Sequence, residues 1–217
     1  MTCPRRVVPG TTYLLTRRCV QRRYTLVPRG VVPKLLGYCV ALAAERHGVE
    51  VHAVTCMSNH WHAVVTDVHG TIPEFCRDVH SLSARALNAH LGRWEALWSS
   101  QRLSLVELID APDVWDKLVY TLTNPVEAGL VARSSEWPGL RTRPVDMGRE
   151  PRTFKRPRTS FFRRSTLPKE VRLQLTVPGM LVPADPKTFA RELQLREPFR
   201  QSRRKPKICN LRNRATG

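Results

Sequence analysis

Two histidines one residue apart, His60 and His62, open the strand-forming run His60-Trp61-His62-Ala63-Val64-Val65. Side chains alternate between the faces of a strand, so both imidazoles project from one face about 6.6 Å apart, while Trp61 points the opposite way, toward a core. This spacing suits one metal ion. Two histidines alone are weak support, because a chain with 7 histidines can contain this pattern by chance.

Tyr120 and Asn124 form a second pattern in the sequence Tyr120-Thr-Leu-Thr-Asn124-Pro125. Residues four apart share one face of a helix, with Cβ atoms about 5 to 6 Å apart. Tyr120 could then carry a nucleophilic oxygen, and the amide of Asn124 could offer a carbonyl ligand to a metal. The structural alternatives are a partly buried core aromatic and a residue that ends a helix before proline.

Hydrophobic periodicity predicts the elements that must position these residues. It favours strands at residues 11–20, 49–56, 60–67 and 102–109, and helices at residues 32–47, 72–91 and 113–123. Strand, helix, strand, strand, helix, strand and a further helix is the order of an α+β, ferredoxin-like or RRM-like split β-α-β sandwich with a four-stranded antiparallel sheet. Trp94 and Trp98 are expected to pack in a core rather than to stack on bases.

The net charge of +18 indicates a polyanionic partner, and nucleic acid is the leading candidate. Residues 149–217 carry a net charge of +14, whereas residues 1–148 carry +4. We therefore expect one domain at residues 1–147 and a basic, Pro/Arg-rich extension at residues 148–217 that is partly ordered at most. A strand at 171–177 and a helix at 187–200 are the elements expected there. The extension is either a solvated segment or a nucleic-acid arm.

The six cysteines contain no Cys-x-x-Cys pair, which argues against a zinc ribbon and favours reduced thiols. No apolar run is long enough to span a bilayer, and the first ten residues lack the apolar core of a signal peptide. These features predict a cytoplasmic, nucleoid-associated protein with no membrane partner and no small-molecule cofactor.

Together, Ser58-Asn59-His60-Trp61-His62 and the stretch from Tyr120 to Val131 resemble the REP-associated tyrosine transposases, relatives of the single-tyrosine HUH transposases of insertion sequences. The resemblance covers roughly residues 9–143. It implies that His60, His62 and Asn124 bind a divalent metal, Mg²⁺ or Mn²⁺, and that Tyr120 is the nucleophile. Imidazole ligands suit manganese, but the residues do not choose between the two ions.

The resemblance also implies a function: cleavage and transfer of single-stranded DNA at palindromic repeat hairpins, through a 5′-phosphotyrosine intermediate. Basic residues are the candidates for DNA contact, namely Arg17, Arg18, Arg22, Arg23 and Arg102. The main alternative is a domesticated protein that binds DNA hairpins without cutting them. An RNA-binding module is a weaker alternative, because its aromatic sheet motif is absent from the sequence. Monomer and dimer both stay open.

Overall fold

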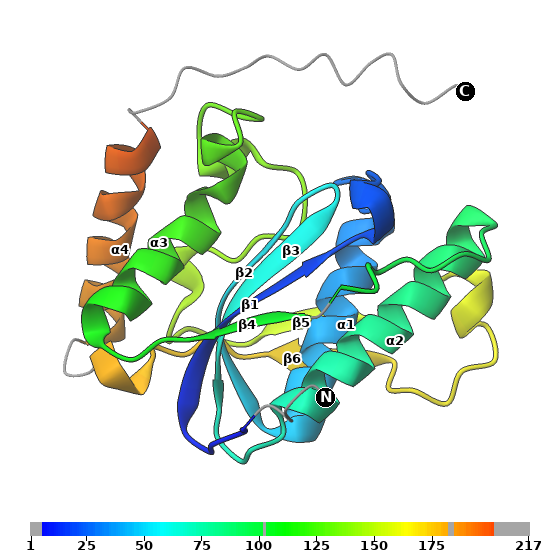
Figure 1. The fold of residues 1–217 in the computed structure, drawn as a ribbon, viewed down its shortest axis with the longest axis horizontal. Coiled ribbons are helices and arrows are strands. Elements are labelled where there is room, and N and C mark those ends of the chain that lie inside the picture. The colour runs from blue at the N-terminus through cyan, green and yellow to red at the C-terminus, as the bar shows by residue number, and fades with distance from the viewer. Residues whose placement is uncertain (1–5, 102, 182–184, 202–217) are drawn as a thin grey trace.

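The computed structural model describes residues 6–101, 103–181 and 185–201. Its main sheet is antiparallel, with strand order β2-β3-β1-β4 (Figure 1). The strands are β1 (Thr11–Arg18), β2 (Val49–Cys56), β3 (His60–Asp67) and β4 (Ser104–Glu107). This order is the one that a split β-α-β sandwich requires, so the predicted α+β, ferredoxin-like fold is confirmed.

Helices cover both faces of the sheet. They are α1 (Val32–His47) and α2 (Ile72–Leu91) on one face and α3 (Ala111–Glu127) on the other. Trp61 on β3 makes an edge contact with His80 of α2 at 5.7 Å between ring centroids, whereas its neighbour His62 contacts Tyr120 of α3 at 5.2 Å. Because adjacent strand residues face opposite ways, these contacts place α2 and α3 on opposite faces.

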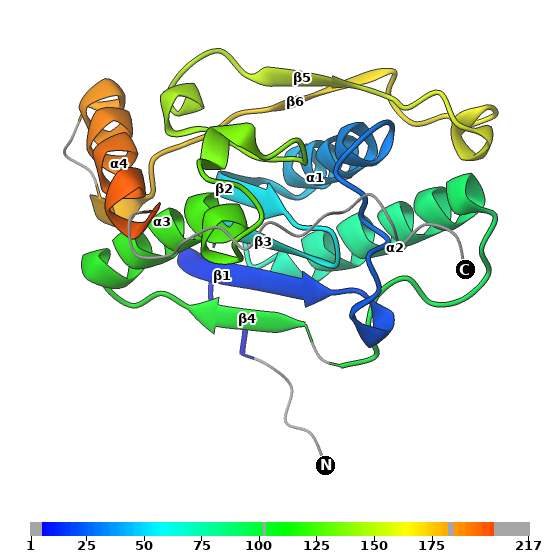
Figure 2. The same cartoon turned by 90° about the horizontal axis from the view of Figure 1, so that it is seen from above.

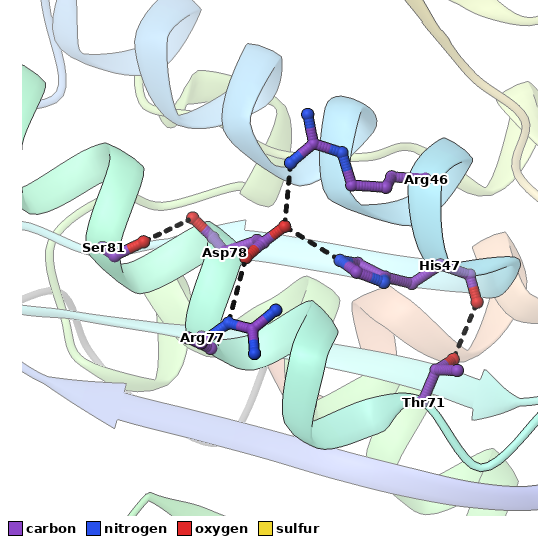
Figure 3. Close-up of polar contacts among 6 residues, drawn as sticks. All are labelled: Arg46, His47, Thr71, Arg77, Asp78 and Ser81. Carbon is purple, nitrogen blue, oxygen red and sulfur yellow. Dashed lines mark hydrogen bonds and ion pairs between the residues drawn. The ribbon is translucent and has the colours of Figure 1, made fainter.

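Asp78 ties the two helices of the first face together (Figure 3). Its carboxylate accepts hydrogen bonds from Arg46 at 3.0 Å and from His47 at 2.9 Å, both on α1, and from Arg77 at 3.3 Å on its own helix. Burial raises the pKa of Asp78, but these hydrogen bonds outweigh burial and hold the pKa below its usual value. The hydroxyl of Thr71 also donates to the carbonyl of His47, which joins the start of α2 to the end of α1.

The described part of the segment after Met147 packs against the helices that cover the main sheet and forms no separate core. The hairpin of β5 (Arg152–Lys155) and β6 (Glu170–Leu173) packs on α1, and α4 (Pro186–Gln201) packs on α3 (Figure 2). Phe154 of β5 occupies the space left by Gly37 of α1, where a Cβ atom would overlap the phenylalanine ring. Five short 3-10 helices complete the described part: η1 (Val20–Arg22), η2 (Ser134–Glu136), η3 (Pro144–Asp146), η4 (Ser160–Phe162) and η5 (Gly179–Leu181).

Several expected elements differ from the structure in extent. The strand expected at residues 102–109 is β4, residues 104–107, and α3 continues through Pro125, so Asn124 lies within the helix instead of ending it. The core prediction holds for Trp98, which is buried and donates from Nε1 to the carbonyl of His80, but it is wrong for Trp94, which is 95% exposed. Among the described residues, no helix is both long and apolar enough to cross a membrane.

Candidate active site

His62 sits in the middle of the sheet with one ring nitrogen held and the other free. It pairs with Thr16 of β1 in register, and its Nδ1 lies 2.7 Å from the hydroxyl oxygen of Thr16. Its Nε2 is buried and has no hydrogen-bond partner among the described residues. When Nδ1–H donates to a neighbouring oxygen, Nε2 keeps a lone pair, which is the usual arrangement of a metal-binding histidine.

His60 is oriented by a chain of two hydrogen bonds. Its Nδ1 donates to Oδ1 of Asn59 at 2.6 Å, and Nδ2 of Asn59 donates in turn to the carbonyl of Arg22 at 3.3 Å. That carbonyl follows two residues with positive φ angles, Gln21 at 51° and Arg22 at 54°, a conformation uncommon for residues other than glycine. The unusual turn in η1 thus places the carbonyl that fixes Asn59, and Asn59 fixes the tautomer of His60.

Both imidazoles are neutral at pH 7, with their ring centroids 4.7 Å apart. Burial lowers the pKa of His60 to about 4; the positive charge of Arg18 adds to this effect, and a side-chain hydrogen bond with Asn124 opposes it. Burial also lowers the pKa of His62 to about 3, with further contributions from His60 and Arg18. Neutral imidazoles are the form that binds metal ions.

The helix α3 places Tyr120 and Asn124 over this pair of histidines. The helix begins at an N-cap, Asp110, whose carboxylate accepts a hydrogen bond from the backbone N–H of Asp113 at 2.8 Å. One turn apart on one face of α3, Tyr120 meets the ring of His62, and Asn124 bonds to His60. The structure thus brings together the four residues that the sequence separates by some sixty positions; their chemical roles stay predictions.

A cavity of about 430 Å³ opens beside Tyr120 and His62. Polar groups of Thr16, Ser99, Gln101 and Ser104 line it together with three cationic side chains, those of Arg17, Arg18 and Lys117. Lys117 was not among the residues singled out from the sequence, although it lies three positions before Tyr120 and therefore on the same side of the helix. Its ion pair with Asp116, at 2.9 Å, is partly exposed, and such pairs contribute little free energy.

The basic residues predicted to contact DNA separate into different environments. Arg18 pairs with His60 in register and lines the cavity, so it lies beside the candidate site. Arg17 pairs with Trp61 instead, and its guanidinium donates to the backbone carbonyls of Ser99 at 2.7 Å and Gln101 at 2.8 Å. These bonds make Arg17 a support for the loop that follows α2.

Two of the other three predicted arginines follow β1 closely in the chain. Arg22 belongs to the η1 turn, and Arg23 follows it; both are exposed, and Arg23 donates from Nε to the side-chain oxygen of Gln21 at 3.0 Å. Arg102 lies outside the described residues. The structure thus sets Arg18 closest to the histidine pair, and DNA contact by any of these arginines stays a prediction.

The residues present fit a divalent metal ion. Within the described ranges, no group of three His, Cys, Asp or Glu side chains could hold a metal, so a site here needs the amide oxygen of Asn124 beside the imidazoles of His60 and His62. The buried, unpartnered Nε2 of His62 is the observation that favours such an ion, because a buried polar atom without a partner is costly.

These features define a class: a ferredoxin-like sheet whose third strand carries His-x-His beneath a helix that carries a tyrosine. In structure the chain is similar to the REP-associated tyrosine transposase bound to a REP hairpin, with 19% sequence identity and a TM-score of 0.55 over 65% of this chain and 82% of that one. It also aligns with a proposed transposase from Deinococcus radiodurans R1, with 25% identity and a TM-score of 0.38 over 49% of this chain and 85% of that one. No family model and no curated protein matches the chain. The resemblance inferred from the two motifs is confirmed at the level of the fold.

Proposed function

We propose that this protein is a transposase that cuts and joins single-stranded DNA at repeat hairpins and depends on a divalent metal. The observation that carries the proposal is the meeting of His60, His62, Asn124 and Tyr120 on one face of the sheet, beside a cavity lined by cationic side chains. The likeness in fold to a transposase bound to a REP hairpin supports this proposal.

In this proposal His60, His62 and Asn124 hold the metal ion, Mg²⁺ or Mn²⁺. When bound, the ion would act as a Lewis acid and a template at the scissile phosphate. The protein contributes the orientation of the ligands: Thr16 holds Nδ1 of His62, and Asn59 holds Nδ1 of His60. These bonds leave Nε2 of each ring as the atom that can bind a metal.

Tyr120 is the proposed nucleophile. A phenol attacks poorly until its proton is removed, so the reaction depends on the placement of the oxygen and on nearby positive charge. Lys117 and Arg18, which line the cavity beside Tyr120, are placed to hold the scissile phosphate and to stabilise the phenolate. They are further residues that we expect to contribute to the reaction.

The reaction exchanges one phosphodiester for another. As the phenolic oxygen bonds to phosphorus, the bond to the 3′ oxygen breaks, and that oxygen takes up a proton to become a free 3′-OH. The 5′-phosphotyrosyl linkage conserves the bond, so a second 3′-OH can reverse the step and join a different strand. Strand transfer of this kind needs no ATP.

A cleavage assay tests the proposal. Hairpin oligonucleotides from the genomic flanks of its own gene are incubated with the protein and Mn²⁺, and covalent adducts are separated under denaturing conditions. We expect an adduct with the wild type and with Tyr24→Phe, which changes an exposed tyrosine, and none with Tyr120→Phe. Hairpin binding without an adduct for any flank would refute cleavage and support the non-catalytic, hairpin-binding alternative.

A further inference from the structure

A second basic surface lies away from the histidine pair, at the start of the C-terminal segment. It is a shallow groove of about 1080 Å³. Its charged lining consists of four arginines and two acidic residues: Arg141, Arg143, Arg149, Arg152, Asp146 and Glu150. We call this surface the arginine groove.

The arginine groove follows the outer edge of β2. The chain after α3 crosses that edge at Arg141, which pairs with Thr55, and the chain after β6 returns to it at Leu175, which pairs with Val51. The hydroxyl of Thr142 accepts a hydrogen bond from the backbone N–H of Val54 at 2.9 Å. The groove is therefore built on backbone that is anchored to the sheet at two points.

Strand pairing connects the arginine groove to the candidate active site. Thr55 pairs with Arg141 on one side and with His62 on the other. Neighbouring strands lie about 4.8 Å apart, so the backbone of Arg141 is about 10 Å from that of His62. Directly paired residues project from the same face, so Arg141 lies on the face that carries His62, whereas Arg152 belongs to β5, which packs on α1 at the other face. The arginine groove therefore begins two strand spacings from His62, across β2.

The arginines of the groove differ in how firmly they are held. Arg143 makes a two-point ion pair with Asp146, at 3.0 Å from Nε and 2.6 Å from Nη2. The guanidinium of Arg152 lies 4.8 Å over the ring of Phe154 and donates from Nη1 to the backbone carbonyl of Arg141 at 3.4 Å. Arg149 is exposed, and its backbone carbonyl accepts a hydrogen bond from Gln174 at 2.9 Å. Arg149 and Arg152 thus present guanidiniums, the group best suited to bind phosphate oxygens in pairs.

We propose that the arginine groove binds the phosphate backbone of the DNA strand that continues beyond the cleavage site. The identification of the ligand as DNA rests on the proposed function. An arginine surface two strand spacings from His62 suits a flexible polyanion. Contacts to phosphates carry no sequence information, so the groove would add affinity and register without adding base specificity.

Binding to oligonucleotides of graded length tests this proposal. The hairpin is fixed, and its single-stranded flank is extended by 0, 3, 6 or 9 nucleotides beyond the cleavage position. The test variant is Arg149→Ala/Arg152→Ala. The matched control is Arg163→Ala/Arg164→Ala, which removes the same charge from exposed positions just after η4, past the far end of β5. A single Arg149→Ala variant, which leaves the contact with Phe154 intact, guards against misfolding.

We expect the wild type and the control to bind more tightly as the flank grows. The test variant should lose most of that gain, on the order of tenfold, and its dependence of log affinity on log salt should be shallower by about 1 for each arginine removed. Adduct formation with the shortest oligonucleotide should be the same in all variants.

Two results would refute the proposal that the arginine groove binds DNA: no gain in affinity with flank length for the wild type, or equal losses of affinity in the test and control variants. Tight binding of an acidic peptide that does not compete with DNA would also contradict it. If no variant forms an adduct but the test variant alone loses the length-dependent binding, the proposed cleavage fails while the groove stands.

Discussion

Acidification from pH 7.5 to 5.5 should destabilise the folded protein through its buried, neutral histidines. Outside the candidate site these are His52 and His80. Burial lowers the pKa of His52 to about 4, against a hydrogen bond to the carbonyl of Thr176 that raises it. Burial, with the charge of Arg17, lowers the pKa of His80 to about 3. An unfolded histidine has a pKa of about 6.5, so below that pH the unfolded chain binds more protons, and stability falls as the pH falls.

The magnitude follows from these values. At pH 5.5 each histidine is almost fully protonated in the unfolded chain and almost neutral in the folded protein, which lowers the free energy of unfolding by about 1 kcal/mol per residue. For His52 and His80 together the loss is about 2 kcal/mol, a sizeable part of the roughly 5 to 15 kcal/mol that holds a typical domain folded. The loss grows until the pH reaches the pKa of the folded state.

Urea unfolding at a series of pH values measures this effect. His80→Phe keeps a ring in the space between Trp61 and Trp98 and removes one titrating group. We expect the stability of this variant to fall less steeply with acid than that of the wild type, by about 1 kcal/mol at pH 5.5. His90→Phe, at an exposed position of α2, should keep the wild-type slope. If stability depends on pH identically in the wild type, His80→Phe and His90→Phe, buried His80 does not destabilise the folded protein in acid.

Three further predictions concern single side chains. Thr16→Val, which removes the hydroxyl that holds His62, should lower adduct formation about 10- to 100-fold at limiting Mn²⁺ and much less at saturating Mn²⁺, as a titration of Mn²⁺ would show. Thermal stability should also fall, because the buried Nδ1 of His62 loses its partner. Lys117→Ala should slow adduct formation with Tyr120 in single-turnover assays, whereas Lys117→Arg should retain most of the rate. Asp78→Asn should reduce stability by about 1 kcal/mol at pH 7, because the carboxylate, with its pKa held below the usual value, stabilises the fold only where it is charged. The difference should shrink as the pH falls through the lowered pKa of Asp78, and urea unfolding at a series of acidic pH values checks this.

The sheet and the histidine pair could be predicted because they follow from local alternation. Residues of β3 alternate between the two faces, which puts His60 and His62 on one side and Trp61 on the other. The same alternation pairs Arg17 with Trp61 and Arg18 with His60, although both are predicted to contact DNA. The helical spacing that joins Tyr120 to Asn124 also extends back to Lys117. The strand alternation that distinguishes Arg17 from Arg18 and the helical spacing that adds Lys117 to Tyr120 were therefore both present in the sequence.

Other features depend on contacts that no local pattern reveals. The strand at Phe154 has only four residues, Arg-Thr-Phe-Lys, and it forms because Gly37 of α1 leaves room for its ring. In sequence alone that glycine lowers the helix propensity of α1. Trp94 and Trp98 look alike in sequence, and only the fold buries one of them and exposes the other. The arginine groove likewise arises from two segments that meet at the edge of β2.

The most direct test of the central claim is to identify the residue that becomes linked to DNA. The adduct formed by the wild-type protein with its flanking hairpin is digested with protease and nuclease, and the peptide that retains a nucleotide is sequenced by mass spectrometry. We expect a phosphodiester linkage at Tyr120, lost when the metal is chelated. A linkage at any other residue, or an adduct that persists in Tyr120→Phe, would contradict it.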